Sequence, residues 1–122
     1  MSEFPSLSSI QFQKAIREIS DHELNQKKQQ QLVFIFKLIE TNNELKLELK
    51  KPDITNEDQD LYNDIINENK LSLFEQIGRI ENLNNELVNR GLLNEIEKDN
   101  EEEKMMKDIE ELSKKGDELE ED

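Results

Sequence analysis

The sequence contains no cysteine and no tryptophan, and its 122 residues include one histidine, one tyrosine, two prolines and three glycines. The absence of cysteine excludes disulfides, thiolate metal ligands and thiol nucleophiles. The single histidine, His22, cannot form a histidine metal cluster. The scarcity of aromatic residues, with phenylalanine and tyrosine at 5% of the chain, argues against a β-sheet protein, because aromatic side chains are enriched in strands.

Long hydrophobic stretches are also missing. The longest run of consecutive apolar residues is five, from Leu32 to Phe36, whereas a transmembrane helix needs about 20. The first residues, Met1-Ser2-Glu3, lack the basic start of a secretory signal peptide. Together with the lack of cysteine, these features predict a cytoplasmic protein, with the nucleus as a second location.

Basic residues are few: the chain has 16 Lys and Arg against 30 Asp and Glu, which gives a net charge of −14. The net charge is +1 over residues 1–51, −6 over residues 52–91 and −9 over residues 92–122. Nucleic-acid binding depends on neutralising phosphates, so this balance excludes an ordinary DNA- or RNA-binding protein. It also argues against binding to anionic membrane surfaces.

The residues that are present favour helices. Leu, Ile, Val and Phe account for 35 of the 122 residues, which is enough to fold, although the hydrophobic share of 33% is below the usual value of about 45–50%. Abundant Leu, Ile, Glu, Lys and Asn suit long helices that meet along narrow apolar seams. We therefore expect an all-α protein with a single domain.

The N-terminal part predicts a flexible arm followed by a short helix. Residues 1–9 contain Pro5 and four serines, and we expect them to be mobile. Phe12 and Ile16 then lie one helical turn apart, and Ser9 is a candidate N-cap for the helix that contains them. Residues 20–23 have the Ser-x-x-Glu pattern of a capping box, which predicts that a second helix begins there.

A long helix is predicted over about residues 20–50. Its seam residues, apolar or amide except for one lysine, recur at alternating spacings of four and three residues, the pattern of a coiled coil: Leu24, Lys28, Gln31, Ile35, Leu38, Asn42, Leu45 and Leu49. Pro52 ends this helix, because proline disfavours helical geometry in the residue before it.

A second long helix is predicted over about residues 56–90, between an N-cap at Thr55 and a C-terminal glycine at Gly91. Its seam has the same spacing: Tyr62, Ile66, Asn69, Leu73, Gln76, Ile80, Leu83 and Leu87. The short linker between the two helices requires them to run antiparallel. We thus expect residues 10–91 to form an antiparallel two-helix coiled-coil hairpin with a short N-terminal helix.

Residues 92–122 predict an acidic tail that is partly helical and partly disordered. Apolar residues such as Met105 and Met106 are sparse there, and we interpret them as the weak stripe of a marginal helix. The end of the chain, from Gly116 to Asp122, is almost entirely charged, and we expect it to be disordered.

No motif in the chain indicates an enzyme. The sequence has no nucleophile elbow, glycine-rich phosphate loop, His-Glu-x-x-His motif or calcium-binding loop. The carboxylates of Asp60, Asp64 and Glu68 are each one helical turn apart, and we interpret them as an exposed helix face. We expect no catalytic residue, no metal site and no cofactor.

The strongest anomaly is residues 32–39, where seven of eight residues are apolar and surround nearly the whole helix. A two-helix hairpin buries only one stripe of each helix. Phe34 and Phe36 are therefore candidates to contact a protein partner. Alternatively, the short N-terminal helix and the segment after residue 91 cover this second face. Asn42 and Asn69 likewise either fix the register of the hairpin or face water.

Two stretches of the chain share a pattern with one protein family. Residues 12–24, FQKAIREISDHEL, match F-x-x-A-I-x-x-x-S-D-x-E-L, and residues 61–69, LYNDIINEN, match L-Y-x-D-x-x-x-E-N. In these stretches, and in the order of helices over about residues 10–90, the sequence resembles the fungal ATPase-dedicated, or translation-machinery-associated, assembly chaperones of the proteasome regulatory particle.

The resemblance implies a non-catalytic, stress-linked chaperone. Such a protein binds ATPase subunits of the regulatory-particle base and favours their pairing before the ring closes. We expect it to contact a helical or coiled-coil segment of the ATPase, and self-association is a further option. The residues expected to bind the partner are Phe12, Ile16, Phe34, Phe36, Tyr62 and Phe74.

Two other functions fit the same sequence. The first is a permanent coiled-coil subunit of a kinetochore, tether or transcription complex. The second is an acidic chaperone of histones or ribosomes that binds through its C-terminal tail.

Overall fold

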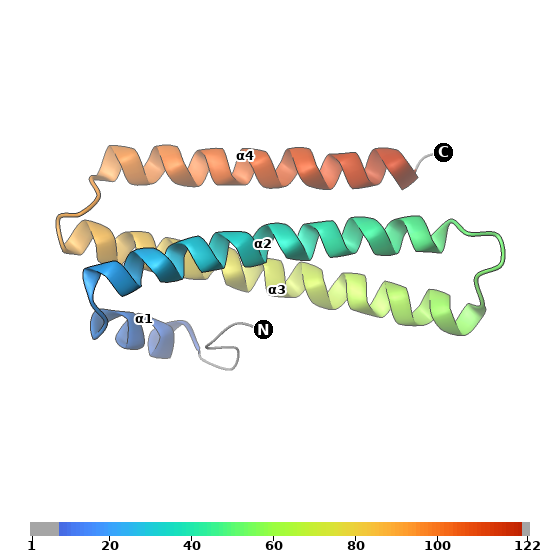
Figure 1. The fold of residues 1–122 in the computed structure, drawn as a ribbon, viewed down its shortest axis with the longest axis horizontal. Helices are drawn as coiled ribbons and strands as arrows, with labels where there is room; N and C mark the ends of the chain where they lie inside the picture. Colours follow the sequence, from blue (N-terminus) through green and yellow to red (C-terminus); the bar gives the residue numbers. More distant parts are fainter. Residues whose placement is uncertain (1–7, 121–122) are drawn as a thin grey trace.

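The computed structural model describes residues 8–120 and, within the last helix, side chains up to Asp117. It contains four helices: α1 (Ser9–Arg17), α2 (Asp21–Leu49), α3 (Asn56–Asn89) and α4 (Glu95–Glu120) (Figure 1). No strand occurs in this part of the chain, so the all-α prediction is confirmed. None of the four helices has an apolar stretch of the length needed to cross a membrane.

Side-chain caps begin the first three helices. Ser20 and Thr55 accept hydrogen bonds from the backbone N–H groups of Glu23 and Asp58, both at 3.1 Å, which confirms these two predicted N-caps. The N-cap of α1 is Ser8 rather than the expected Ser9. Ser8 and Ser9 therefore belong to α1 and not to the predicted N-terminal arm, whose other residues, 1–7, lie outside the described part.

Gly91 ends α3 as predicted. Its φ of 73° lies in the left-handed region, which glycine adopts without steric cost. The N–H of Leu92 donates to the carbonyl of Leu87 at 2.9 Å, and the N–H of Gly91 donates to the carbonyl of Val88 at 3.0 Å. This pair of bonds is a Schellman motif, and it turns the chain back toward α4.

The two longest helices, α2 and α3, lie side by side and run antiparallel (Figure 1). The buried side chain of Gln31 donates to that of Gln76, and Asn42 Nδ2 donates to the carbonyl of Ile66 at 3.3 Å. Asn69 Nδ2 donates to Asn42 Oδ1 at 2.9 Å. Asn42 and Asn69 thus bond across the hairpin, which favours the register-fixing role over exposure to water.

The buried side of α2 follows the predicted seam up to Ile35 and again at Asn42, but not at every position. Leu24 and Ile35 are fully buried, but farther along the helix Ile39 and Lys46 are buried where Leu38 and Leu45 were expected. The buried positions shift because α2 packs against α4 as well as against α3. Helix α4 covers the side of α2 that lies next to the predicted seam. A helix between two partners buries a wider side than a two-helix seam requires.

The hydrophobic core is one cluster to which all four helices contribute. Its buried members are Phe12, Ile16, Leu24, Ile35, Ile39, Ile80, Leu83, Leu87, Met105 and Ile109. The short helix α1 packs on α3, and the alternative that α1 covers the second face of α2 is therefore not the main arrangement.

The C-terminal region is more ordered than the sequence predicted. Residues 95–120 form one helix that runs parallel to α2, and the expectation of disorder from Gly116 onward is wrong for residues 116–120. Residues 121 and 122 lie outside the described part. Met105 and Ile109 are each 6% exposed, so even a sparse apolar stripe suffices when α2 provides the opposing apolar surface.

Gly116 of α4 lies directly against Asn43 of α2. A Cβ atom at this position would lie 1.9 Å from Oδ1 and 2.5 Å from Cγ of Asn43. The Asn43 amide is itself held, because its Nδ2 donates to the carbonyl of Leu112 at 3.2 Å. The lack of a side chain at residue 116 therefore lets α4 dock.

Replacing this glycine tests the docking of α4. We expect Gly116→Ala to lower the free energy of unfolding by about 1–3 kcal/mol, because the new methyl group overlaps Asn43. The matched control is Gly78→Ala in α3, where no atom lies within 4 Å of the new Cβ. That change should raise the free energy of unfolding by about 0.5–1 kcal/mol through helix propensity. Urea denaturation monitored by circular dichroism measures both, and equal stabilisation by the two variants would contradict the contact.

Candidate interaction surfaces

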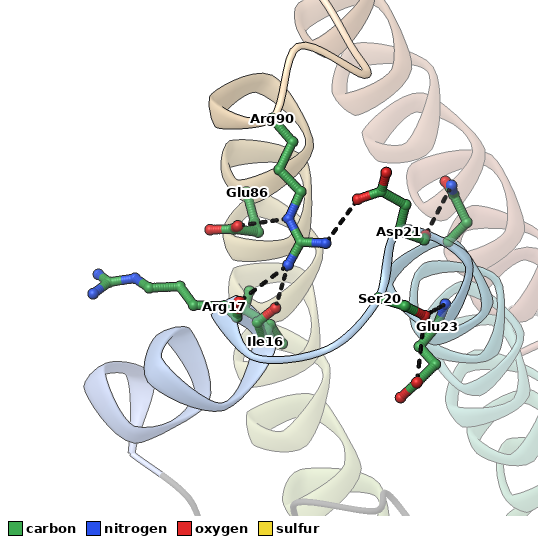
Figure 2. A network of polar contacts seen from close by, with 8 residues as sticks. Ile16, Arg17, Ser20, Asp21, Glu23, Glu86 and Arg90 are labelled. Carbon is green, nitrogen blue, oxygen red and sulfur yellow. Dashed lines mark hydrogen bonds and ion pairs between the residues drawn. The ribbon is translucent and has the colours of Figure 1, made fainter.

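A polar junction joins three helices at one end of the molecule (Figure 2). Arg90, the C-cap of α3, is bonded through Nε to Glu86 at 2.8 Å and through Nη1 to Asp21 at 2.9 Å. Its Nη2 donates to the carbonyls of Ile16 and Arg17, at 3.0 and 3.3 Å. One guanidinium therefore caps the end of α1, binds the start of α2 and holds the end of α3.

The charges of this junction stabilise one another. The hydrogen bonds that Arg90 donates to the carboxylates of Glu86 and Asp21 raise the pKa of its guanidinium above the ordinary value. The two carbonyls that Arg90 binds belong to the last turn of α1, where backbone acceptors have no helical partner. All four contacts of Arg90 thus stabilise the packing of the helix ends, and we assign the junction a structural role.

The first stretch of the family resemblance lies in this junction and in the core. Phe12, Ile16 and Leu24 are buried, Ser20 caps α2, and Asp21 binds Arg90. The residues of this pattern therefore have a structural role: they connect α1 to α2 and anchor both in the core. His22 lies beside it, exposed on the first turn of α2.

The six residues expected to bind a partner do not form one surface. Phe12 and Ile16 are each 2% exposed and lie in the core, with Arg79 stacked over the Phe12 ring at 5.1 Å. Neither can contact a partner while α1 stays on α3. This placement differs from the expectation because their spacing marks a buried stripe equally well.

Phe34 and Phe36 lie on opposite flanks of α2. Two positions along an α-helix are about 200° apart, so a single partner helix cannot contact both rings. Phe36 packs against the core and lines a hollow between α2 and α4. Phe34 is half-buried on the flank away from that hollow. The apolar run 32–39 is thus explained in part by the two neighbours of α2.

Tyr62 and Phe74 lie farther along the hairpin. Tyr62 is half-buried near the linker between α2 and α3, where it lines a hollow with Lys51 and Asp53. Phe74 is 71% exposed on α3. Among the six residues, Phe74 is the one that is mostly exposed.

The surroundings of Phe74 follow from the length of α1. Helix α1 has nine residues, about 13 Å, and its polar contacts with α3 begin at Asn82, which bonds to Ser9 and Gln13. Beyond the start of α1, a hollow of about 270 Å³ opens between Ser9 and Phe74. From there to residue 61, this side of α3 is not covered by α1.

We call the exposed residues on this side the open α3 face. It combines three apolar side chains, which are 53–71% exposed, with three carboxylates: Leu61, Asp64, Glu68, Leu71, Phe74 and Glu75. Contiguous exposed apolar side chains bordered by charge are typical of a protein interaction site. Since the charged members are all acidic, this face favours a partner with basic side chains.

Leu61 and Leu71 were missed as candidate site residues. They recur with Asp64, Glu68 and Glu75 at spacings of three and four residues, which places all five on one side of a helix. This second stripe could have been found in the sequence. The prediction of one coiled-coil seam for each long helix left this second stripe of α3 without a role.

Acidic residues do not assemble into a metal site. Asp60, Asp64 and Glu68 are exposed on α3. Over the residues that the structure describes, no group of three or more carboxylates and histidines could hold a metal ion.

The hollow that Phe36 lines between α2 and α4 has a volume of about 330 Å³. Its walls are mostly apolar and include Leu32 and Phe36 of α2, Ile80 of α3 and Met105 of α4. Charged residues of α4, among them Glu101, also line it. The hollow shows that α4 does not fill the apolar surface that α2 presents.

No family model, curated protein or solved structure matches the chain. The candidate surfaces are therefore assigned from the geometry and the sequence alone.

The structural role of the junction is tested by Arg90→Lys. Lysine cannot bind Glu86, Asp21 and the α1 carbonyls together, because a single ammonium replaces a planar fork of five N–H groups. We expect a thermal midpoint several degrees below that of Arg17→Lys, the matched control, whose side chain points away from the junction in Figure 2. Thermal unfolding by circular dichroism measures both midpoints, and equal values would show that the junction does not stabilise the fold.

Proposed function

We propose that the protein is a non-catalytic assembly chaperone that binds ATPase subunits of the proteasomal regulatory-particle base through the open α3 face and promotes their pairing. The resemblance in residues 12–24 and 61–69 supports the family. The observation that carries the binding surface is the shortness of α1, which leaves Leu61, Leu71 and Phe74 exposed on one side of α3.

The second stretch of the resemblance supports the same surface. Within it, Asn69 bonds to Asn42 across the hairpin, and Tyr62 is half-buried near the linker, so both have a role in folding. Leu61, Asp64 and Glu68 are exposed. These three side chains are therefore available to contact a client.

The proposed client segment is an amphipathic helix with basic side chains beside its apolar stripe. Residues 56–78 of α3 precede its contacts with α1 and are about 35 Å long, which accommodates a client helix of roughly 20 residues. Such a helix would lie in line with α1 and add to the packed pair α2 and α3 as a further helix of the bundle. Asp64, Glu68 and Glu75 would face its basic side chains.

The strength of this contact suits a transient chaperone. Full burial of each exposed apolar side chain on the open α3 face contributes about 1.5–3 kcal/mol. Since these side chains are 53–71% exposed and thus already partly buried, the three provide at most about 5–9 kcal/mol, against an association cost of about 4–15 kcal/mol. The net affinity is therefore modest, and the completed ring displaces the chaperone by competing for the same helix, without a nucleotide.

The test is capture of base ATPase subunits by the purified, immobilised protein. We expect Phe74→Asp to reduce capture at least tenfold, because a charge replaces the largest and most exposed apolar side chain of the surface. The matched control is Ile96→Asp, since Ile96 is 72% exposed but lies at the start of α4, away from the open α3 face. Circular dichroism should show the same helix content in both variants.

Three results would contradict the proposal. The first is an eluate without base ATPase subunits. The second is equal loss of capture in the Phe74 and Ile96 variants. The third is a stoichiometric complex that persists in high salt, which would indicate a permanent structural subunit, because a contact guided by carboxylates weakens as salt screens it.

Tail-driven binding needs a variant that preserves the fold. Deletion of the C-terminal region would remove Met105 and Ile109 from the core, so it cannot separate binding from stability. Glu103 and Glu110 are exposed on α4. If Glu103→Lys with Glu110→Lys abolished capture while Phe74→Asp did not, the acidic helix and not the open α3 face would be the binding site.

A further inference from the structure

Helix α4 covers α2 with few apolar contacts. Among its side chains that the structure describes, Met105 and Ile109 are the buried hydrophobic ones, and Leu112 is half-buried. The opposing surface of α2 is richer, and Phe36 stays partly exposed beside the hollow of about 330 Å³. Because unfilled space forfeits packing contacts, α4 is a poor fit to this surface.

Two ion pairs hold α4 at this surface. Lys28 Nζ lies 2.5 Å from Glu101 Oε2, and Lys46 Nζ lies 2.6 Å from Asp117 Oδ1. The lysine side chains are 10% and 11% exposed, whereas the carboxylate side chains are 47% and 60% exposed. The lysines are thus a fixed part of the α2 surface, and the carboxylates approach them from the solvent side.

The buried lysines determine what this surface can bind. A buried ammonium group without a partner carries a desolvation penalty, so any helix that replaces α4 must bring a carboxylate to each lysine. Lys28 and Lys46 are 18 residues apart, and Glu101 and Asp117 are 16 residues apart on the parallel helix α4. A basic helix is excluded by repulsion.

We infer that α4 is a releasable cover, and that the surface beneath it is a second docking site for an acidic amphipathic helix. We call this surface the covered α2 face and define it by Lys28, Leu32, Phe36, Asn43 and Lys46. The inference goes beyond the proposed function, because it concerns another side of the molecule and holds whether or not the open α3 face binds a client. The two sites select helices of opposite charge.

The probe for this site is a fluorescein-labelled peptide with the sequence of residues 95–120, titrated into the full-length protein. We expect fluorescence anisotropy to show saturable binding as the peptide exchanges with the protein's own α4. A peptide with Glu101→Lys and Asp117→Lys should bind at least tenfold more weakly. A peptide with Asp108→Leu should bind several-fold more tightly, since residue 108 lines the hollow beside Phe36.

Release of α4 is tested by a disulfide lock. The side chain of Asn43 and the Cα of Gly116 face each other closely enough for Asn43→Cys with Gly116→Cys to form a bond, and the chain has no other cysteine. Oxidation should reduce peptide binding at least tenfold relative to wild type. Reduction should restore it above wild type, because a side chain at residue 116 crowds the α2 contact.

Equal peptide binding by the oxidised and reduced forms would overturn the inference. A reduced form that binds no peptide, although its circular dichroism spectrum is native, would also overturn it.

Amide hydrogen exchange gives an independent measurement. We expect α4 amides to exchange at least tenfold faster than those in the middle of α3, and equal rates would contradict a releasable cover. The oxidised lock should still capture base ATPase subunits, so failure at the covered α2 face and failure at the open α3 face are distinguishable.

Discussion

Helix α2 packs against α3 and α4 at once, and the rest of the structure depends on this packing. Leu24 and Ile35 are fully buried between the neighbouring helices, and α1 enters the core by packing on α3. The chain has too few apolar residues for a thick core, and α2 is apolar around most of its surface between residues 32 and 39. Loss of either neighbour of α2 would expose that surface.

Polar side chains inside the α2–α3 seam select its register at some cost in stability. Gln31 bonds to Gln76, and Asn42 bonds to the carbonyl of Ile66, so a shift by one turn would leave buried amides without partners. An all-leucine seam would be more stable but would also permit other pairings. For a thin helical protein with exposed apolar surface, a fixed register limits self-association in wrong alignments.

Local signals in the sequence predicted the helices well. The long helices expected over residues 20–50 and 56–90 are α2 at 21–49 and α3 at 56–89, because Ser20, Thr55 and Gly91 act through contacts within a few residues. The docking of α4 could not be predicted in this way. It depends on the approach of Gly116 to Asn43 and on the surface of α2, both distant in sequence.

The candidate site was predicted less well than the fold, for the same reason. Phe12 and Phe74 are both phenylalanines on helices, yet one is 2% and the other 71% exposed. The difference is set by where α1 begins and which side of α3 it covers, and composition carries no information on either. Phe34 and Phe36 show the related limit that neighbours in sequence lie on opposite flanks of one helix.

The arrangement of the helices separates two surfaces of different chemistry. Helix α1 covers part of α3 at one edge of the molecule, and α4 lies against α2 at the opposite edge (Figure 1). The uncovered part of α3 carries carboxylates, whereas the surface under α4 carries two buried lysines. Since a helix that satisfies one set of charges is repelled by the other, two bound helices would have to come from different segments. The two surfaces would therefore select helices of opposite charge, at opposite edges of the molecule.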